Sequence, residues 1–595
     1  MARVRRRLSL TDNLATEARR PMSGMHAIDW AILPIYLIGV TVLGAWTARR
    51  VTSSGDFFMP RRFGKAMMIT FAFGTGTSSD QAVTVASKTL TNGLSAIWWQ
   101  WVWLPATPFY WLLAPIFRRL RAVTTADVYE LRYDRSVGVL FAIVGVAGLA
   151  VKIGLLLKGA GAMVDSCTGG VVDANLAILV VTGLFLAYGM AGGLGAAVVT
   201  DFVQGLMTVA FSFLLLPFVL HATGGIEGVR RVVGDYNPQM LSLLAPQKIN
   251  VFFVVMYSIQ ALVGIVAQPF IMGVCGAGKT EMDGRVGFMV GNLVKRVCTM
   301  AWAITSLAAV AWLLGRGVDL STVEPDHLYG NVARAFLPDI LPGLLGVFLA
   351  CLLASIMSSC DAIMISASAL FTENLYRPAL PGRPDGHYIG VGRLASAAIV
   401  AVGVWFAFWV PSVVEALDIW FKVAPLVGIA FWIGLFWRKA TPAGAWAGTL
   451  AAVGAWWLTT REGFASWLWQ FAWLRDAAIV QRPAGGPPIA DDAWIIVAYL
   501  TAGVAACVLV SLVTKPTPAE RLDRFYDLTR TPVREGEVVP GPCRMPEGVS
   551  APPRRMLLQA GGFEVPMPSG TSAAGFAAGW AMVAVMVAGF VWIVG

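Results

Sequence analysis

The chain contains 595 residues, of which 57% are hydrophobic and only 13% are charged. A mean hydropathy of +0.67, together with repeated apolar runs of about twenty residues, excludes a soluble globular protein and predicts an all-α polytopic membrane protein. The formal net charge of +10 comes from basic residues that lie between the apolar runs. We therefore expect the lipid bilayer, and no nucleic acid, as the large-scale partner.

The apolar segments predict about fourteen transmembrane helices. A polar, arginine-rich tail at 1–25 precedes them, and we expect it to be disordered. The segments lie at about 27–48, 65–89, 94–117, 137–165, 173–191, 201–221, 251–273, 287–314, 340–371, 389–410, 413–437, 442–459, 491–514 and 573–593.

Two of these segments contain interruptions. The stretch 73–81 (FGTGTSSDQ) is too polar and glycine-rich for an uninterrupted lipid-facing helix, and Pro269 places a residue without a backbone donor inside the seventh segment. The two lie five segments apart, as in a secondary transporter with a 5+5 inverted-repeat core and a central binding site. Ordinary kinks are the alternative interpretation.

The inverted-repeat interpretation divides the chain into seven parts. After the tail come a first helix and its loop (26–64), a first five-helix repeat (65–222) and a second five-helix repeat (250–440). Two additional helices with an outer amphipathic segment (441–514), a cytoplasmic loop (515–571) and a last helix (572–595) complete it.

The basic residues predict the orientation. Arginine and lysine concentrate in alternate loops and in the loop 515–571, and the positive-inside rule assigns these loops to the cytoplasm of a cell (inner) membrane. Both termini then lie outside. The arginines of the tail argue for the opposite placement of the N-terminus; they are Arg3, Arg5, Arg6 and Arg7.

The ninth segment carries a polar face. Ser355, Ser358 and Ser359 lie at offsets that place them on one side of a helix, and Asp361 follows on nearly the same side. Serines of this kind commonly bond to their own helix or join neighbouring helices. A carboxylate beside them in an apolar helix is costly unless it faces a cavity, a partner or an ion, and this favours a functional site.

Several motifs resemble those of the sodium:solute symporters, and the resemblance covers roughly residues 27–440. The serine pair and its neighbours look like the family's ninth-span helix and its terminal signature, and the polar break in span two keeps the spacing of Gln81 to Gly93 found in sugar carriers. The segments that carry the resemblance are 354–359 (ASIMSS), 370–376 (LFTENLY), 191–194 (AGGL), 200–204 (TDFVQ), 522–526 (LDRFY) and 531–533 (TPV).

This resemblance implies a leucine-transporter-like inverted-repeat fold and a sodium site between spans two and nine. A hard cation such as sodium prefers oxygen ligands, which a broken helix supplies as free carbonyls. The implied ligands are the carbonyls of Gly74, Thr77 and Ser355 and the hydroxyls of Ser358 and Ser359, with Asp201 near the inner ion path and Asp361 at a second ion position. The implied substrate-facing residues are Gln81, Gln100, Gln260 and Lys295.

The chain also departs from the sugar carriers. Val263 and Gly264 replace an aromatic pair that closes their pocket, which puts a sugar substrate in doubt. Asp80 and Lys152 add charges to the membrane interior, where an unpaired charge costs at least ~2.5–3.5 kcal/mol. We hypothesise that Lys152 pairs with Asp80 or Asp361.

Residues 273–280 match the phosphate-binding pattern GxxxxGK[ST]. The pattern binds nucleotide only between a strand and a helix, and here a predicted membrane helix precedes it. We expect a cytoplasmic turn and no nucleotide.

The sequence thus predicts a transporter rather than an enzyme, with no cofactor besides sodium as the coupling ion. The predicted function is sodium-coupled symport of a small polar organic solute by alternating access. A transporter-like solute sensor and a proton-coupled transporter that uses Asp80, Asp361 and Lys152 are the alternatives. The solute and the oligomeric state are left open.

Overall fold

The computed structural model describes residues 24–48, 57–245, 249–483, 485–534, 536–537, 541–553 and 555–594. Residues 1–23 of the predicted polar tail therefore lie outside the described part. These described residues are helical almost throughout, and the strands among them form two short antiparallel pairs, β1 with β2 and β3 with β4.

The part of the chain that holds the predicted first repeat contains the following helices. They are α2 (Ala27–Ala48), α4 (Lys65–Gly76), α5 (Ser79–Asn92), η1 (Gly93–Ile97), α6 (Trp98–Trp101), α7 (Thr107–Arg119), α8 (Thr125–Arg132), α9 (Arg135–Thr168), α10 (Ala174–Leu214), α11 (Leu216–Ala222), α12 (Gly225–Tyr236) and η2 (Pro238–Leu241).

The part that holds the predicted second repeat contains α13 (Val251–Ile265), α14 (Phe270–Gly276), α15 (Glu281–Gly315), η3 (Leu320–Thr322), η4 (Pro325–His327), α16 (Leu328–Ile340), α17 (Leu344–Ala369), the π-helical η5 (Leu370–Tyr376), α18 (Arg377–Ala379), α19 (Asp385–Trp409) and α20 (Val413–Phe436).

The rest of the chain contains α21 (Pro442–Thr459), α22 (Glu462–Leu468), α23 (Ala472–Asp476), β1 (Val480–Gln481), β2 (Ile489–Ala490), α24 (Asp492–Val513), α25 (Ala519–Arg530), β3 (Met556–Ala560), β4 (Phe563–Pro566) and α26 (Gly570–Val594).

The structure confirms the all-α polytopic class. Within the described residues nine helices are long and apolar enough to cross a membrane, or ten if the bent pair α13–α14 is one span. The count of about fourteen stays a prediction, because several of the predicted segments appear as shorter or broken helices. The predicted segment 173–191 falls on the first part of α10, and 201–221 falls on its second part and on α11; the two parts of α10 meet at a kink at Gly193, where φ is +58°.

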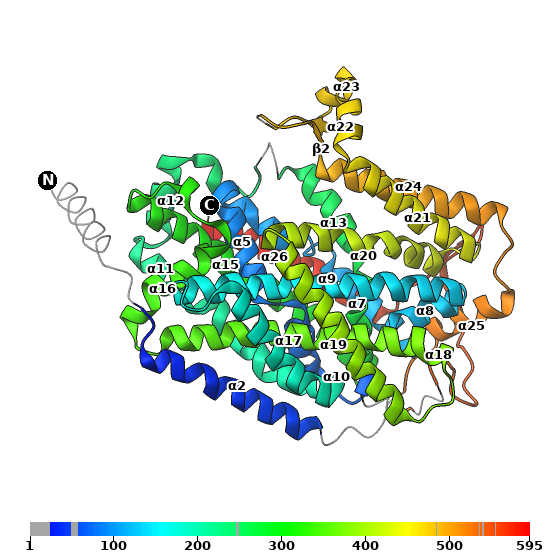
Figure 1. Cartoon of the computed structure of the whole chain (residues 1–595). Helices are drawn as coiled ribbons and strands as arrows, with labels where there is room; N and C mark the ends of the chain where they lie inside the picture. The colour runs from blue at the N-terminus through cyan, green and yellow to red at the C-terminus, as the bar shows by residue number, and fades with distance from the viewer. Residues whose placement is uncertain are drawn as a thin grey trace.

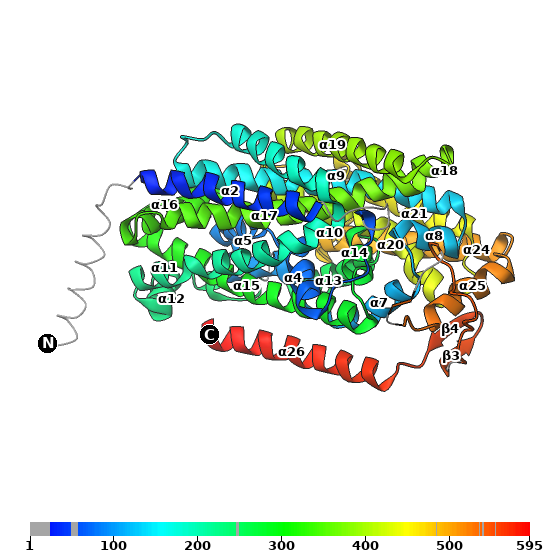
Figure 2. The same cartoon turned by 90° about the horizontal axis from the view of Figure 1, so that it is seen from below.

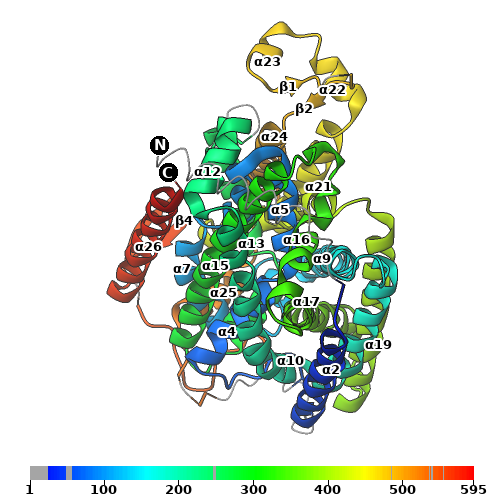
Figure 3. The ribbon, with the colours of Figure 1, turned by 90° about the vertical axis from the view of Figure 1, so that its left-hand side faces the viewer.

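Helix α17 lies at the centre of the molecule. The most apolar part of this span is completely buried, and α17 contacts α2, α4, α9, α10 and α19. Figure 3 shows α2 and α26 at two different edges of the helix assembly. A central helix without lipid contact can carry polar side chains, because neighbouring helices surround them.

The two ends of the described chain lie at the same end of the molecule (Figures 1 and 2). Helix α2 starts beside the start of α17, where the Gly346 amide donates to the Asp29 carboxylate at 2.7 Å. The carbonyl of Val594, at the end of α26, accepts from Arg230 in α12 at 2.7 Å. Helix α25 and the β3–β4 hairpin cover the opposite end, together with arginines of the loops predicted to be cytoplasmic.

Candidate functional site

The first broken span opens between α4 and α5. Thr77 and Ser78 both have extended backbone angles, φ −131° and −145°, so the helical hydrogen-bond ladder stops at Gly76 and restarts at Ser79. Glycine and hydroxyl residues are weak helix formers in this setting, and the Ser78 hydroxyl bonds to the Asp80 carboxylate instead. The break therefore frees carbonyl groups in the protein interior, within the stretch 73–81 predicted from the sequence.

The serine face of α17 packs against this break. The Ser359 hydroxyl donates to the carbonyl of Gly74 at 2.8 Å and lies 3.3 Å from that of Thr77. The hydroxyl of Ser355 accepts from the Ser79 amide at 2.9 Å. A Cβ at Gly74 would lie 2.6 Å from the Ser358 hydroxyl oxygen, so only glycine allows this close approach. The structure thus brings together all five residues that we expected to bind sodium.

The chemistry of this cluster fits a hard cation. The residues present oxygen atoms, and the side-chain oxygens of Thr75, Thr77 and Ser79 are buried without a hydrogen-bond partner among the described residues. Buried oxygens of this kind normally have a partner, so the break has spare coordination capacity. Ser355, whose carbonyl we expected as a ligand, lies in the interior of α17, where backbone carbonyls accept the hydrogen bonds of the helix. The Ser355 group that faces α5 is its hydroxyl.

The two aspartates lie where α10 packs against α17 and α4. A Cβ at Gly74 would lie 2.6 Å from the Ser358 hydroxyl and 3.6 Å from the side chain of Asp201 in α10, so Asp201 and Ser358 meet at Gly74. Asp361 is fully buried and packs against Gly189 of α10 and near Met364. Asp201 therefore belongs to the serine cluster itself, and Asp361 lies in the neighbouring contact between α17 and α10.

Lys152 pairs with Asp80, not with Asp361. Its ammonium nitrogen lies 3.6 Å from the Asp80 carboxylate, and the aspartate side chain is completely buried. The same nitrogen lies 5.8 Å from the centre of the Trp420 ring. Of the two partners that the sequence left open, the structure selects the one on the broken span.

A small cavity of about 50 Å³ lies beside the break. Gln81, Gln100 and Lys295 line it, as do Lys152 and Thr75. Gln260, the fourth residue expected to face the solute, lines a smaller adjoining pocket. Three of the four predicted residues thus share one cavity. The two pockets share Trp103, Gln268 and Trp420.

The polar residues of the cavity bind the end of α4. Lys295 donates to the carbonyl of Gly76 at 2.5 Å, and the Gln81 side-chain amide donates to the same carbonyl at 2.9 Å. Gln260 instead donates to the carbonyl of Phe421 at 2.6 Å. The sodium-site cluster and the cavity therefore meet at the four residues Gly74–Thr77: Ser359 contacts the carbonyls of Gly74 and Thr77, and the cavity residues bind that of Gly76.

Sequence analysis missed two features of this cavity. Arg296 lines it beside Lys295 and donates to the carbonyl of Gln100 at 2.8 Å; two consecutive basic residues inside a predicted span were the signal. The other feature is the contact between Trp103, in the turn before α7, and Phe421 of α20, whose rings are 4.7 Å apart. Both rings line the adjoining pocket together with Gly264, one of the two positions where the sequence lacks the aromatic pair, and Trp103 also lines the main cavity.

The phosphate-binding pattern has a structural role at a helix start. Gly273 and Gly276 lie within α14, and Thr280 is the N-cap of α15 in a capping box with Asp283. The amide of Lys279 donates to the carbonyl of Phe63 at 2.9 Å. Helical residues at the start of the motif and a capping threonine at its end form a turn between helices.

The broken spans, the buried serine helix and the oxygen-lined break define a polytopic secondary transporter with an inverted-repeat core. A model of the family described as "Sodium:solute symporter family" matches residues 57–452. The chain belongs to this family, as the motifs of spans two, six and nine indicated, and the family is one of transporters, not of enzymes.

Curated relatives agree with this assignment. The sodium/pantothenate symporter of Haemophilus influenzae is 25% identical over 460 residues, which are 73% of this chain and 90% of the relative. The osmoregulated proline transporter OpuE of Bacillus subtilis is 25% identical over 449 residues, 72% of this chain and 88% of the relative. The sodium/glucose cotransporter of Vibrio parahaemolyticus is 23% identical, covering 72% and 84%.

A solved structure confirms the fold. The substrate-bound, outward-open state of a Na⁺-coupled sialic acid symporter superposes with a TM-score of 0.66 and 15% identity, covering 83% of this chain and 99% of the other. These relatives carry chemically different solutes, so family membership supports sodium-coupled symport without identifying what this chain carries.

Proposed function

We propose that the protein moves a small polar organic solute together with sodium across the cell membrane by alternating access. Sodium binds the cluster of Gly74, Thr77, Ser358 and Ser359, with Asp201 beside it, and the solute binds the cavity that Lys295 and Gln81 line. The observation that carries this proposal is the shared segment Gly74–Thr77, because Ser359 bonds to it from one side and Lys295 and Gln81 bond to it from the other.

A shared segment couples the two binding events. Sodium at the serine face would hold the unwound carbonyls in one arrangement, and that arrangement fixes where Gly76 presents its carbonyl to the cavity. A ligand that favours one conformation of such an element raises the affinity of the second ligand for the same conformation, and the effect is reciprocal. Sodium thereby increases solute affinity, and solute increases sodium affinity by the same factor.

The proposal is tested by uptake into proteoliposomes that carry an inward sodium gradient. The double variant Ser358→Ala/Ser359→Ala is expected to lose sodium-dependent uptake, because two ligand oxygens are removed. Ser366→Ala is the matched control: it lies on the same helix, and its hydroxyl bonds only to the Ala362 carbonyl of its own helix at 2.7 Å. Sodium-dependent uptake that survives in the double variant would contradict the proposal.

Proton coupling is the second candidate, since Asp80, Asp201 and Asp361 are all completely buried. A proton-coupled protein would accumulate solute under a pH gradient in sodium-free buffer. A solute sensor would bind its solute with sodium but show no flux in vesicles. Each outcome replaces sodium symport by a different mechanism, and the same vesicle preparation distinguishes all three.

A further inference from the structure

The cavity beside the broken span carries an unbalanced charge. Lys152, Lys295 and Arg296 all line it, and Asp80 is the carboxylate that pairs with Lys152. Lys295 is 7% exposed and Arg296 1%. Within the described part of the chain, three cationic side chains thus line one small cavity, and an ion pair with a carboxylate is formed by Lys152.

The partners of the two other cations are neutral. Lys295 donates to the Gly76 carbonyl and faces the ring of Trp103 at 5.7 Å. Arg296 donates to the Gln100 carbonyl and lies 6.0 Å from the centre of the Trp103 ring. Carbonyl groups satisfy hydrogen bonds but leave the net charge in place, and a charge buried in a membrane interior is costly without a counter-charge.

Open hydrogen-bonding groups accompany the charge. The Arg296 Nε and the Gln100 side-chain nitrogen are buried without a hydrogen-bond partner among the described residues, and both are donor groups. Unsatisfied donors together with excess positive charge match the oxygens of a carboxylate, which accepts several hydrogen bonds and supplies the missing negative charge.

We propose that the solute is a small organic anion with at least one carboxylate and no compensating amine. Its carboxylate binds between Lys295 and Arg296, and Trp103 packs against its apolar part. This inference rests on the proposed symport function and adds the chemical class of the solute.

The test measures thermal stabilisation of the purified full-length protein by matched pairs of compounds, in sodium chloride and in choline chloride. The pairs are pyruvate with methyl pyruvate, succinate with succinamide, and benzoate with benzamide. At least one acid is expected to raise the unfolding temperature in sodium, while its uncharged partner leaves it unchanged, since a ligand bound only to the folded state stabilises it. Equal stabilisation by an uncharged partner would overturn the inference.

Failure of the inference is distinguishable from failure of the proposed function. Stabilisation by sodium alone, with none of the acids adding to it, leaves sodium binding intact and removes the anion assignment. No response to sodium under any condition removes the proposed function itself. Both readouts use the unaltered protein and require no variant to fold.

A variant adds a second, independent readout. Lys295→Gln keeps a donor for the Gly76 carbonyl but removes the charge, and the stabilising acid is expected to bind at least about tenfold more weakly. Lys158→Gln is the control, because it makes the same change of a lysine in a predicted span, in α9, at a residue that does not line the cavity. Unchanged acid binding by Lys295→Gln would contradict the placement of the carboxylate.

Discussion

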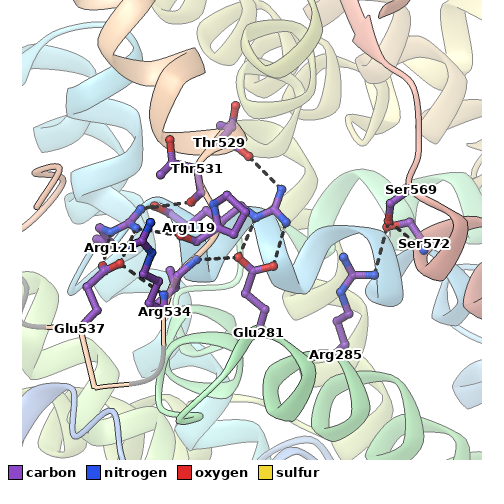
Figure 4. A network of polar contacts seen from close by, with 12 residues as sticks. Arg119, Arg121, Glu281, Arg285, Thr529, Thr531, Arg534, Glu537, Ser569 and Ser572 are labelled. Atoms are coloured by element: carbon purple, nitrogen blue, oxygen red, sulfur yellow. Dashed lines mark hydrogen bonds and ion pairs between the residues drawn. The ribbon is translucent and has the colours of Figure 1, made fainter. Parts of the chain in front are cut away.

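Basic residues serve opposite purposes in two regions of this molecule. At the end covered by α25 and the β3–β4 hairpin, arginines meet carboxylates: Arg119 pairs with Glu281 at 2.8 Å, and Arg121 with Glu537 at 2.5 Å (Figure 4). In the central cavity, Lys152, Lys295 and Arg296 line one space, and of these three Lys152 pairs with a carboxylate, that of Asp80. Paired charges hold helices and loops in place, and excess charge in an enclosed cavity indicates a ligand.

The paired region connects distant parts of the chain. Arg119 lies in α7 and Glu281 starts α15, and Glu281 also accepts from the amide of Val533 at 2.9 Å. The segment 529–537 thus binds α7 and α15 at the same point, as Figure 4 shows. Since α7 and α15 belong to different predicted repeats, any motion between the repeats at this end has to break these contacts.

The largest expected effect comes from breaking the ion pair that Lys152 of the cavity lining forms with Asp80. Lys152→Met leaves the Asp80 carboxylate buried and uncompensated, which is expected to lower the free energy of unfolding by about 3 kcal/mol. Unfolding in detergent measures it. The double variant Lys152→Met/Asp80→Asn should recover most of the loss, because it removes both charges. A single variant as stable as the unaltered protein would show that the pair carries no stability.

A smaller effect is expected from the network at the end of the molecule. Glu281→Gln loses the ionic bonds to Arg119 and weakens the bond to Val533, and hydrogen bonds to charged groups contribute about 1.5–3 kcal/mol each when buried, less when partly exposed as here. Hydrogen exchange of residues 519–537 is expected to quicken. Glu520→Gln, an exposed change on α25, is the control. Equal exchange in both variants would mean that Glu281 does not hold this segment.

The same network predicts a pH dependence. Burial alone raises the pKa of Glu537, but the hydrogen bonds and positive charge of Arg121 outweigh it, so that the pKa lies below the ordinary value of 4.5. A depressed pKa in the folded state adds stability above the unfolded pKa of about 4.5 and loses it as the pH falls through the lower folded value. The protection of residues 529–537 against hydrogen exchange, expressed relative to the intrinsic rate at each pH, should therefore fall below about pH 4.5 in the unaltered protein. In Glu537→Gln this protection should be low and similar at pH 4 and 7.

The smallest effect is expected at the exposed edge of the network. Arg438 pairs with Asp523, whose side chain is 60% exposed. Exposed ion pairs contribute about 0–1 kcal/mol because water and salt screen them. Asp523→Asn should leave the unfolding transition and the exchange of α25 nearly unchanged. A loss of stability as large as that of Glu281→Gln would show that the burial of these ion pairs does not determine how much each one contributes.

Local pattern predicted much of this architecture. The polar, glycine-rich stretch at 73–81 contains the observed break, and the apolar segment predicted at 340–371 corresponds to α17 (Leu344–Ala369). Both features were predictable because they depend on the local sequence and not on how helices pack. The partner of Lys152 was not predictable, since it depends on how α9 rotates against α5. The positions of Arg296 and Gln260 were not predictable for the same reason. The packing of the helices determines that Arg296 lines the main cavity and that Gln260 lines the adjoining pocket.

The sodium site can be tested most directly without knowing the solute, by the unfolding temperature of the purified protein in sodium chloride and in choline chloride. Sodium is expected to raise the unfolding temperature of the unaltered protein, of Ser366→Ala and of Lys295→Gln, and to leave that of Ser359→Ala unchanged, because Ser359 lies between the carbonyls of Gly74 and Thr77. An undiminished sodium response in Ser359→Ala would contradict a sodium site at the break.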